Sequence, residues 1–260
     1  MFLTLLVISL LGGFMAGFLG VGGALVITPL MLTIPPLVGV GELSMKTVAG
    51  LSMVQVLFSS FSGIIVHNKN RFIFRPALIF IGIPMGLAAF VGSYFSKYFS
   101  NIALLYLFFA ITIIFFLSFV LDKKVSDEKR SLEELKINKF FAMVTGSITG
   151  VISGMVGVGG GFILIPFMRY ILKIPLKVTI GTSLGIIFIG ALTGAIGKAA
   201  SFQVEFALVL PIIIGSSVAA NLGAKANEKT GANAIRYIFM GVIILSIIQV
   251  ILKIIEAHQL

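Results

Sequence analysis

Long apolar stretches separated by short polar segments dominate this chain of 260 residues. Uncharged runs such as 48–66, 76–96 and 102–121 are each about 20 residues long, the length that an α-helix needs to cross the hydrocarbon core of a membrane. The pattern predicts eight membrane spans, at roughly 3–32, 47–66, 73–96, 101–121, 140–169, 177–198, 204–224 and 233–254. We therefore expect an all-α polytopic membrane protein.

The first and fifth apolar stretches are too long for one upright helix, and both contain the same glycine-rich phrase. Residues 17–29 read GFLGVGGALVITP, and residues 154–166 read GMVGVGGGFILIP. The identical positions are four glycines, one valine and the closing proline. Matching Gly/Pro interruptions in the two halves of a membrane protein are typical of a transporter's binding site. The phrase thus predicts a helix broken by glycines at the start of each half, with a full helix followed by a shorter piece that is either tilted or re-entrant.

The two halves also correspond after the phrase, where the offset falls from 137 to 131 positions. The matching residues are Lys46, Gly50, Ser52 and Gly63 with Lys177, Gly181, Ser183 and Gly194. This indicates a duplicated four-span unit, with a first repeat at 1–121, a polar linker at 122–139 and a second repeat at 140–260. Four spans is an even number, so the repeats should share one orientation; counting each broken segment as two half-passes would change that parity.

Composition and charge narrow the class of protein. Hydrophobic residues make up 58% of the chain, charged residues 11%, and the mean hydropathy of +1.16 argues against a soluble domain. The N-terminus has no basic residue before its apolar run and no polar cleavage region, so we expect a retained first helix rather than a signal peptide. The net charge of +10 comes from lysines and arginines between apolar runs, which suits anionic lipid headgroups better than nucleic acid. Six of them lie at 123–139, which favours a cytoplasmic location for the linker and both termini.

No grouping of residues points to an enzyme. The chain has no cysteine and only two histidines, which leaves no basis for a disulfide, a metal site or a haem site. Nucleophile–base sets and phosphate-binding loops are missing from the sequence. We therefore expect no enzymatic activity, cofactor or metal.

The glycine phrase could bind a ligand through its backbone N–H groups. Glycines permit positive φ, and unwinding a helix there frees N–H groups at the start of a new half-helix, which favours an anion. The alternative is that glycines such as Gly146, Gly150 and Gly154 allow helices to pack closely, which is the better interpretation of any single one. For the doubled phrase we expect a binding site, whose candidates are Gly20, Gly22, Gly23, Pro29, Gly157, Gly159, Gly160, Gly161 and Pro166.

A second set of candidates is polar and small. Ser52 and Gln55 in the first repeat, and Thr182 and Ser183 in the second, could donate hydrogen bonds to an oxyanion, or merely tie helices together. The spans carry no ionisable side chain away from their ends, which disfavours a carboxylate relay and suits an anionic substrate. Lys198 lies near a helix end, where its ammonium group could attract anions to the mouth of a pathway but is rather expected to snorkel to the headgroups, and the same holds for Lys46 and Lys177.

The chain resembles the TauE/SafE family, also called the sulfite exporter or toluene-sulfonate uptake permease family. Three features carry the resemblance: the doubled Gly-x-x-Gly-x-Gly-Gly-(Ala/Gly) phrase that closes on proline, the Lys-x-x-x-Gly-x-Ser element after it, and the four-plus-four layout. The resemblance covers nearly the whole chain. It implies a transporter in a bacterial or archaeal plasma membrane that moves small sulfur-containing anions, with the two glycine breaks lining the pore. Ala24 stands where the second copy has Gly161, so the first break is expected to be less open.

The leading hypothesis is a secondary transporter, monomeric or homo-oligomeric, that binds a small oxyanion between the repeats and works by alternating access. Its expected partners are the lipid bilayer, the anion and a coupling ion, with no nucleic acid. Two other hypotheses remain open: a passive anion channel, and a membrane subunit that scaffolds a partner without transporting anything.

Overall fold

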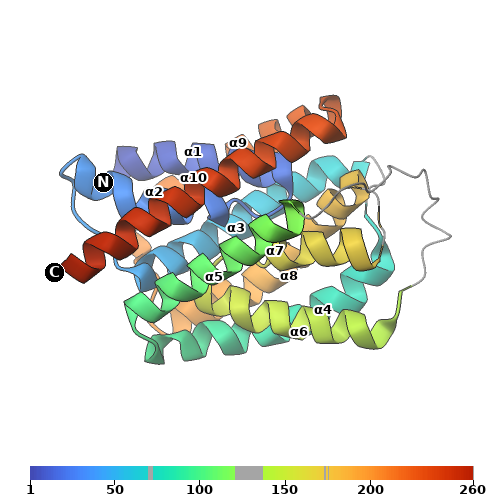
Figure 1. Ribbon diagram of the computed structural model, residues 1–260, viewed down its shortest axis with the longest axis horizontal. Coiled ribbons are helices and arrows are strands. Elements are labelled where there is room, and N and C mark those ends of the chain that lie inside the picture. The colour runs from blue at the N-terminus through green and yellow to red at the C-terminus, as the bar shows by residue number, and fades with distance from the viewer. Residues whose placement is uncertain (70–72, 121–136, 173, 175, 260) are drawn as a thin grey trace.

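The computed structural model describes residues 1–69, 73–120, 137–172, 174 and 176–259, and within these ranges all regular structure is helical. Eight helices are long and apolar enough to cross a membrane, as the hydropathy pattern predicted. They are α1 (Phe2–Leu19), α3 (Met45–Lys69), α4 (Arg75–Phe95), α5 (Asn101–Val120), α6 (Lys139–Val156), α8 (Leu176–Ala200), α9 (Val209–Lys229) and α10 (Ala232–Gln259). All of them lie roughly along one direction (Figure 1).

Two shorter segments follow the broken helices. They are α2 (Ala24–Leu37), and α7 (Gly161–Pro166) with its π-helical continuation η3 (Phe167–Ile171). Each turns back along the helix before it: a Cβ placed on Gly12 of α1 would lie 3.1 Å from Cβ of Ile27 in α2. The glycine phrase therefore ends one pass and begins a return, rather than interrupting a single pass.

The repeats are inverted, which corrects the expectation of a shared orientation. The equivalent helices α3 and α8 run antiparallel across each other, because Gly63 packs on Leu184 whereas Gly194 packs on Met53. The physical reason is the return segments, which give each repeat five segments instead of four. Because the first repeat has an odd number of segments, the second repeat starts from the opposite side. The halves are then related by an axis in the membrane plane. The alternative parity considered from the sequence is the one observed.

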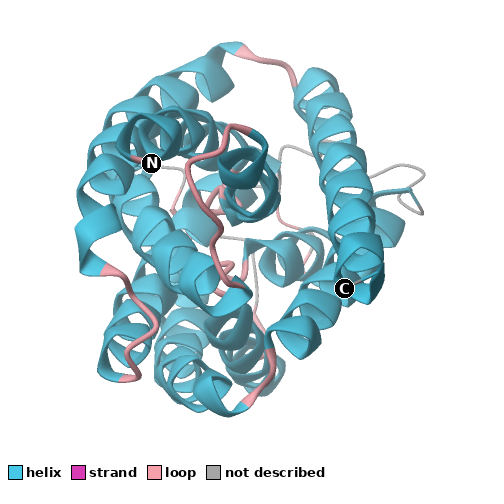
Figure 2. Cartoon of the chain, turned by 90° about the vertical axis from the view of Figure 1, so that its left-hand side faces the viewer, coloured by secondary structure: helices cyan, strands magenta, loops and turns pink. Residues whose placement is uncertain are grey.

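Both chain termini lie at one end of the bundle, and Figure 2 looks onto that end. Helix α5 ends and α6 begins toward the opposite end, away from both termini (Figure 1). The expectation that the linker shares a side with the termini is therefore wrong. The error came from counting each broken stretch as one pass. The capping-box motif noted at Ser131–Glu134 falls outside the described residues.

Close helix packing depends on glycine, as the packing interpretation of the single glycines predicted. Gly146, Gly150 and Gly154 of α6 face α4 so closely that a Cβ on any of them would lie within 2.4 Å of a backbone oxygen. In the same way, α1 packs against α9 through Gly13 and Gly17. Each broken helix is thus held by a helix of the other repeat. The short 3₁₀ turns η1 (Ser96–Tyr98) and η4 (Phe206–Leu208) complete the bundle at the terminal end.

Candidate functional site

The two glycine phrases form matching helix breaks. Helix α1 ends at Gly20 and α2 begins after Gly23, while α6 ends at Gly157 and α7 begins after Gly160. Three glycines in each break have left-handed backbone conformations: φ is +73°, +85° and +80° at Gly20, Gly22 and Gly23, and +81°, +70° and +78° at Gly157, Gly159 and Gly160. A side chain would strain the backbone at all six positions.

The breaks meet at the centre of the bundle, where α3 crosses α8. A Cβ placed on Gly22 or on Gly159 would touch the same two side chains, Val56 of α3 and Ile187 of α8. Gly161 lies directly against the other break, since a Cβ there would sit 2.5 Å from Cα of Val21. Gly161 does not have positive φ, so its absent side chain is needed for space and not for backbone freedom. The two breaks therefore form one buried site.

The N–H groups of Gly20, Gly157 and Val158 donate to the ends of the broken helices, but those of four other break glycines have no partner in the described chain. Among the described residues, no acceptor receives a hydrogen bond from the N–H of Gly22, Gly23, Gly159 or Gly160. Several break carbonyls are satisfied: Ser183 Oγ donates to Gly20 O at 2.8 Å, and Ser59 Oγ donates to Gly22 O at 3.4 Å. Unpaired donors at lipid depth cost several kcal/mol each, on the order that burial in hydrocarbon imposes, unless a ligand or water meets them.

Two buried side chains add unpartnered polar atoms to the same place. Gln55 of α3 is fully buried, and its Nε2 would lie 2.8 Å from a Cβ placed on Gly23. Thr149 of α6 is also fully buried and packs against Gly160. Neither the amide atoms of Gln55 nor the hydroxyl of Thr149 has a hydrogen-bond partner within the described chain. Native proteins rarely leave such groups unpaired, so they indicate a site for a ligand.

The predicted hydroxyls hold the protein together around this site. Ser183 bonds Gly20 O, as above, and Ser52 shares a hydrogen bond of 3.1 Å with Thr28 of α2. Thr182 Oγ1 accepts a hydrogen bond of 2.9 Å from the N–H of Phe74. These contacts are the structural ties that the sequence left open as an alternative. Direct contact of these three hydroxyls with an anion stays a prediction.

The two prolines shape the return segments. Pro29 interrupts α2 and removes the donor that Leu25 O would otherwise bond, and Ser246 of α10 donates to this oxygen at 2.6 Å instead. Pro166 ends α7, where the chain continues as a π-helical turn.

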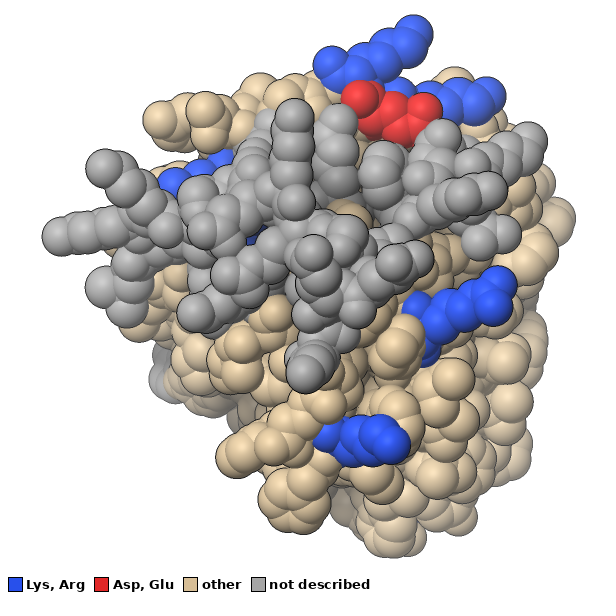
Figure 3. All heavy atoms as spheres, turned by 90° about the vertical axis from the view of Figure 1, so that its right-hand side faces the viewer, with Lys and Arg blue, Asp and Glu red and all other residues tan. Residues whose placement is uncertain are grey.

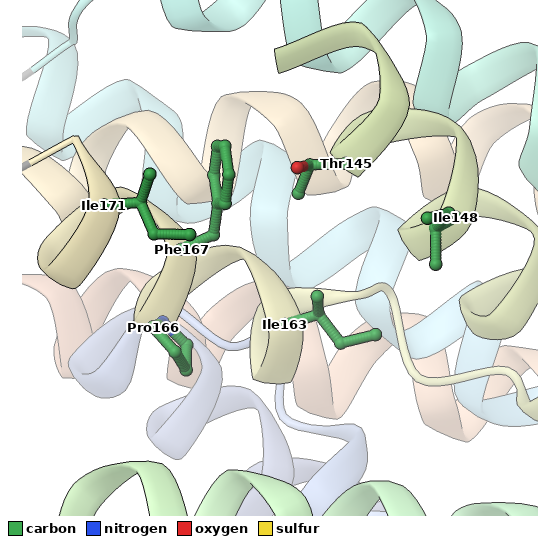
Figure 4. Close-up of a pocket in the computed structure, with 6 residues that line it drawn as sticks. All are labelled: Thr145, Ile148, Ile163, Pro166, Phe167 and Ile171. Carbon is green, nitrogen blue, oxygen red and sulfur yellow. The ribbon is translucent and has the colours of Figure 1, made fainter. Parts of the chain in front are cut away.

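Pro166 also lines a groove of about 440 Å³ between α6 and α7 (Figure 4). The groove is almost wholly apolar, and Ile148 and Ile171 on its wall are 54% and 65% exposed. It therefore faces the lipid and lies apart from the polar centre.

The ends of the two broken helices are held in matching ways. Asn227 Nδ2 donates to Phe18 O at 2.7 Å, and Lys198 Nζ donates to Met155 O, at the corresponding place in the second repeat, at 3.0 Å. Lys198 is fully buried, so the expectation that it snorkels to the headgroups is wrong. Asn227 and Thr149 were not identified from the sequence, where Asn227 lies in the polar end of α9 and Thr149 is one of several small hydroxyl residues of α6.

Comparisons with known proteins agree with this architecture. The model of the "Sulfite exporter TauE/SafE" family matches residues 5–250. Similar curated proteins include "Probable membrane transporter protein YunE" of Bacillus subtilis, 25% identical over 94% of this chain and 95% of that protein. Another is "Probable membrane transporter protein MJ0441" of Methanocaldococcus jannaschii, 29% identical over 93% of this chain and 94% of that protein. A third is "Probable membrane transporter protein YdhB" of Bacillus subtilis, 30% identical over 86% of this chain and 89% of that protein.

No solved structure matches the chain. The family model spans nearly all of the sequence, and the eight membrane-crossing helices and paired glycine breaks belong to the matched region. The chain therefore belongs to the sulfite exporter TauE/SafE family, whose members are membrane transporters and not enzymes.

Proposed function

We propose that this protein is a secondary transporter of small sulfur-containing oxyanions, which bind at the junction of the two glycine breaks. The observation that carries the proposal is a set of four buried N–H groups, at Gly22, Gly23, Gly159 and Gly160, without a partner in the described chain. The positive ends of helix dipoles and free N–H groups favour negative charge. The family's description as sulfite exporters supports sulfite as the first substrate to test.

The surroundings of the breaks favour an anion over a cation. Among the described residues, no aspartate or glutamate is buried, so no carboxylate would repel an anion or hold a sodium ion in the core. Gln55 and Thr149 supply a side-chain amide and a hydroxyl, both able to donate to an oxyanion. A tetrahedral or pyramidal oxyanion presents several acceptor oxygens, which could accept hydrogen bonds from these donors.

The inverted repeats supply a route to alternating access. Val56 and Ile187 close around Gly22 and Gly159, so this conformation holds the breaks tightly packed. In inverted-repeat transporters, exchanging the conformations of the two repeats converts one access state into the other. We infer that rocking of one repeat against the other opens the centre first to one side and then to the other.

We infer the orientation from the distribution of charge. Among the described residues, elements at the linker end carry eight of the 12 lysines and arginines. At the terminal end these residues are Lys46, Lys97, Lys198 and Lys253. Figure 3 views the linker end and shows basic side chains on it. By the positive-inside rule, the linker end faces the cytoplasm of a bacterial or archaeal cell and both termini face outward.

Counterflow in vesicles tests the function. Purified protein in liposomes loaded with unlabelled sulfite should accumulate labelled sulfite transiently against its gradient. Gly22→Leu and Gly159→Leu should abolish this, because the side chain would collide with Val56 and strain a left-handed residue. Gly241→Leu is the matched control, since a Cβ at Gly241 of α10 meets nothing within 4 Å.

Each alternative has its own outcome in this assay. A passive channel would equilibrate sulfite without transient accumulation, and a scaffold subunit would show no flux with sulfite, sulfate, thiosulfate or sulfonates. Unchanged counterflow in Gly159→Leu would show that the glycine breaks take no part in transport.

A further inference from the structure

A buried ammonium group lies beside the second break. Lys198 Nζ donates three hydrogen bonds, to Ser96 Oγ at 2.7 Å, Gln203 Oε1 at 2.9 Å and Met155 O at 3.0 Å. The side chain has no exposed surface. All three acceptors are neutral, so they satisfy the hydrogens of the ammonium group without balancing its charge.

A second lysine is held next to the first. The neighbouring residues Ser96 and Lys97 of η1 each bind one ammonium group: Ser96 Oγ binds Lys198, and Lys97 O accepts a 2.7 Å hydrogen bond from Lys46 Nζ. Within the described chain, no carboxylate lies within ion-pair distance of Lys46 or Lys198, whereas Lys253 is paired with Glu256 at 2.9 Å. Two lysine amino groups are thus held by adjacent residues of η1, without a carboxylate of the described chain in ion-pair distance.

Both charges are adjacent to the proposed substrate path. Met155, which binds Lys198, is two residues before Gly157, the first glycine of the second break. Gly157 itself packs on the backbone of Ala49, one turn along α3 from Lys46. Lys46 is half-buried near the terminal end of the bundle. The pair therefore lies between that end and the site where the breaks meet.

We propose that Lys46 and Lys198 form an outer anion-binding site, through which the oxyanion passes between the terminal side of the membrane and the glycine breaks. The inference rests on the proposed transport of anions. Lys198 has all its hydrogens engaged and acts through its charge. Lys46 has one hydrogen bond and two hydrogens left to donate to the anion directly. Two fixed charges favour a doubly charged oxyanion over a singly charged one.

The test compares sulfite uptake by Lys46→Gln and Lys253→Gln in liposomes that contain the full chain. Both variants remove one charge at the terminal end, but only Lys46 belongs to the pair. We expect Lys46→Gln to raise KM for sulfite about tenfold at low ionic strength, with little change in the maximal rate, and Lys253→Gln to leave KM unchanged. The difference should shrink at high salt, which a purely structural contact would not cause.

A second variant separates charge from stability. In Lys198→Met, an apolar chain of similar length replaces the buried amino group, which leaves Met155 O without its donor, so thermal unfolding of the variant is measured beside its transport. KM for sulfite should rise in this variant as well. If the wild type transports sulfite and Lys46→Gln keeps the same KM and salt dependence, the outer site is refuted while the transport function stands. If the wild type moves none of the anions tested, both proposals fall.

Discussion

The side-chain amide of Gln55 lies against the backbone of Gly23, at the point where the first broken helix turns back. Among the described residues neither polar atom of this amide has a hydrogen-bond partner, although the side chain is fully buried. A buried amide without a partner destabilises the fold by about 1–3 kcal/mol. Such a group is retained where a ligand completes its hydrogen bonds, which connects the unsatisfied amide to binding.

Replacing Gln55 should therefore separate stability from function. Gln55→Leu removes the unsatisfied amide at similar volume, so the melting temperature without ligand should stay the same or rise. The same change should raise KM for sulfite, because a donor to the anion is lost. Gln55→Glu should abolish uptake, since a carboxylate would repel the anion. A normal KM in both variants would show that Gln55 does not contact the substrate.

The hydrogen bond from Asn227 to Phe18 O should be a structural requirement. In Asn227→Leu the carbonyl at the end of α1 loses its donor, and we expect the free energy of unfolding to fall by about 1–3 kcal/mol. Thermal unfolding in detergent measures this. Asn233→Leu, at an exposed position of α10, is the control and should leave the midpoint nearly unchanged. Equal midpoints for the two variants would contradict a stabilising role for the Asn227 contact.

Contact between the breaks should be sensitive to one methyl group. Gly161 has ordinary backbone angles, so Gly161→Ala adds only bulk, and this bulk would press against Val21 of the other break. Overpacking of this kind lowers stability by about 1–3 kcal/mol. We expect lower thermal stability and slower sulfite uptake. Gly241→Ala should cause neither effect, and similar behaviour of the two variants would argue that the breaks are not in contact.

The orientation can be measured directly, because the chain has no cysteine. Glu42→Cys lies exposed in the connection after α2, at the terminal end, and Lys139→Cys lies exposed at the start of α6, at the linker end. A membrane-impermeant maleimide should label the first in intact cells and the second only after the membrane is opened. The reverse pattern would contradict the outward location of the termini.

The sequence predicted the broken helices but not the direction of the chain after them. Glycines that recur at matched positions identify left-handed backbone, because few other residues adopt it. Span counting cannot decide whether a segment such as Ala24–Leu37 continues across the membrane or returns, since its length of 14 residues suits both. The packing of Ile27 on Gly12 decides this, and that contact is tertiary.

The polar residues were predicted unevenly for a similar reason. Gln55 stood out as an amide inside an apolar span. Thr149 did not, because a threonine in a membrane helix ordinarily bonds its own backbone. Lys198 was expected at the headgroups because it lies near a helix end. Its burial depends on Ser96, which reaches it from the first half of the chain, and on Gln203, five residues further on.

Backbone amide signals of the breaks provide the most direct test of anion binding. Protein labelled with ¹⁵N-glycine, in lipid nanodiscs, would be titrated with sulfite, and variants would assign the signals. The account predicts downfield amide-proton shifts at Gly22, Gly23, Gly159 and Gly160, whose N–H groups lack partners, and a constant signal from Gly241. Saturating sulfite that leaves all four signals unmoved would contradict it.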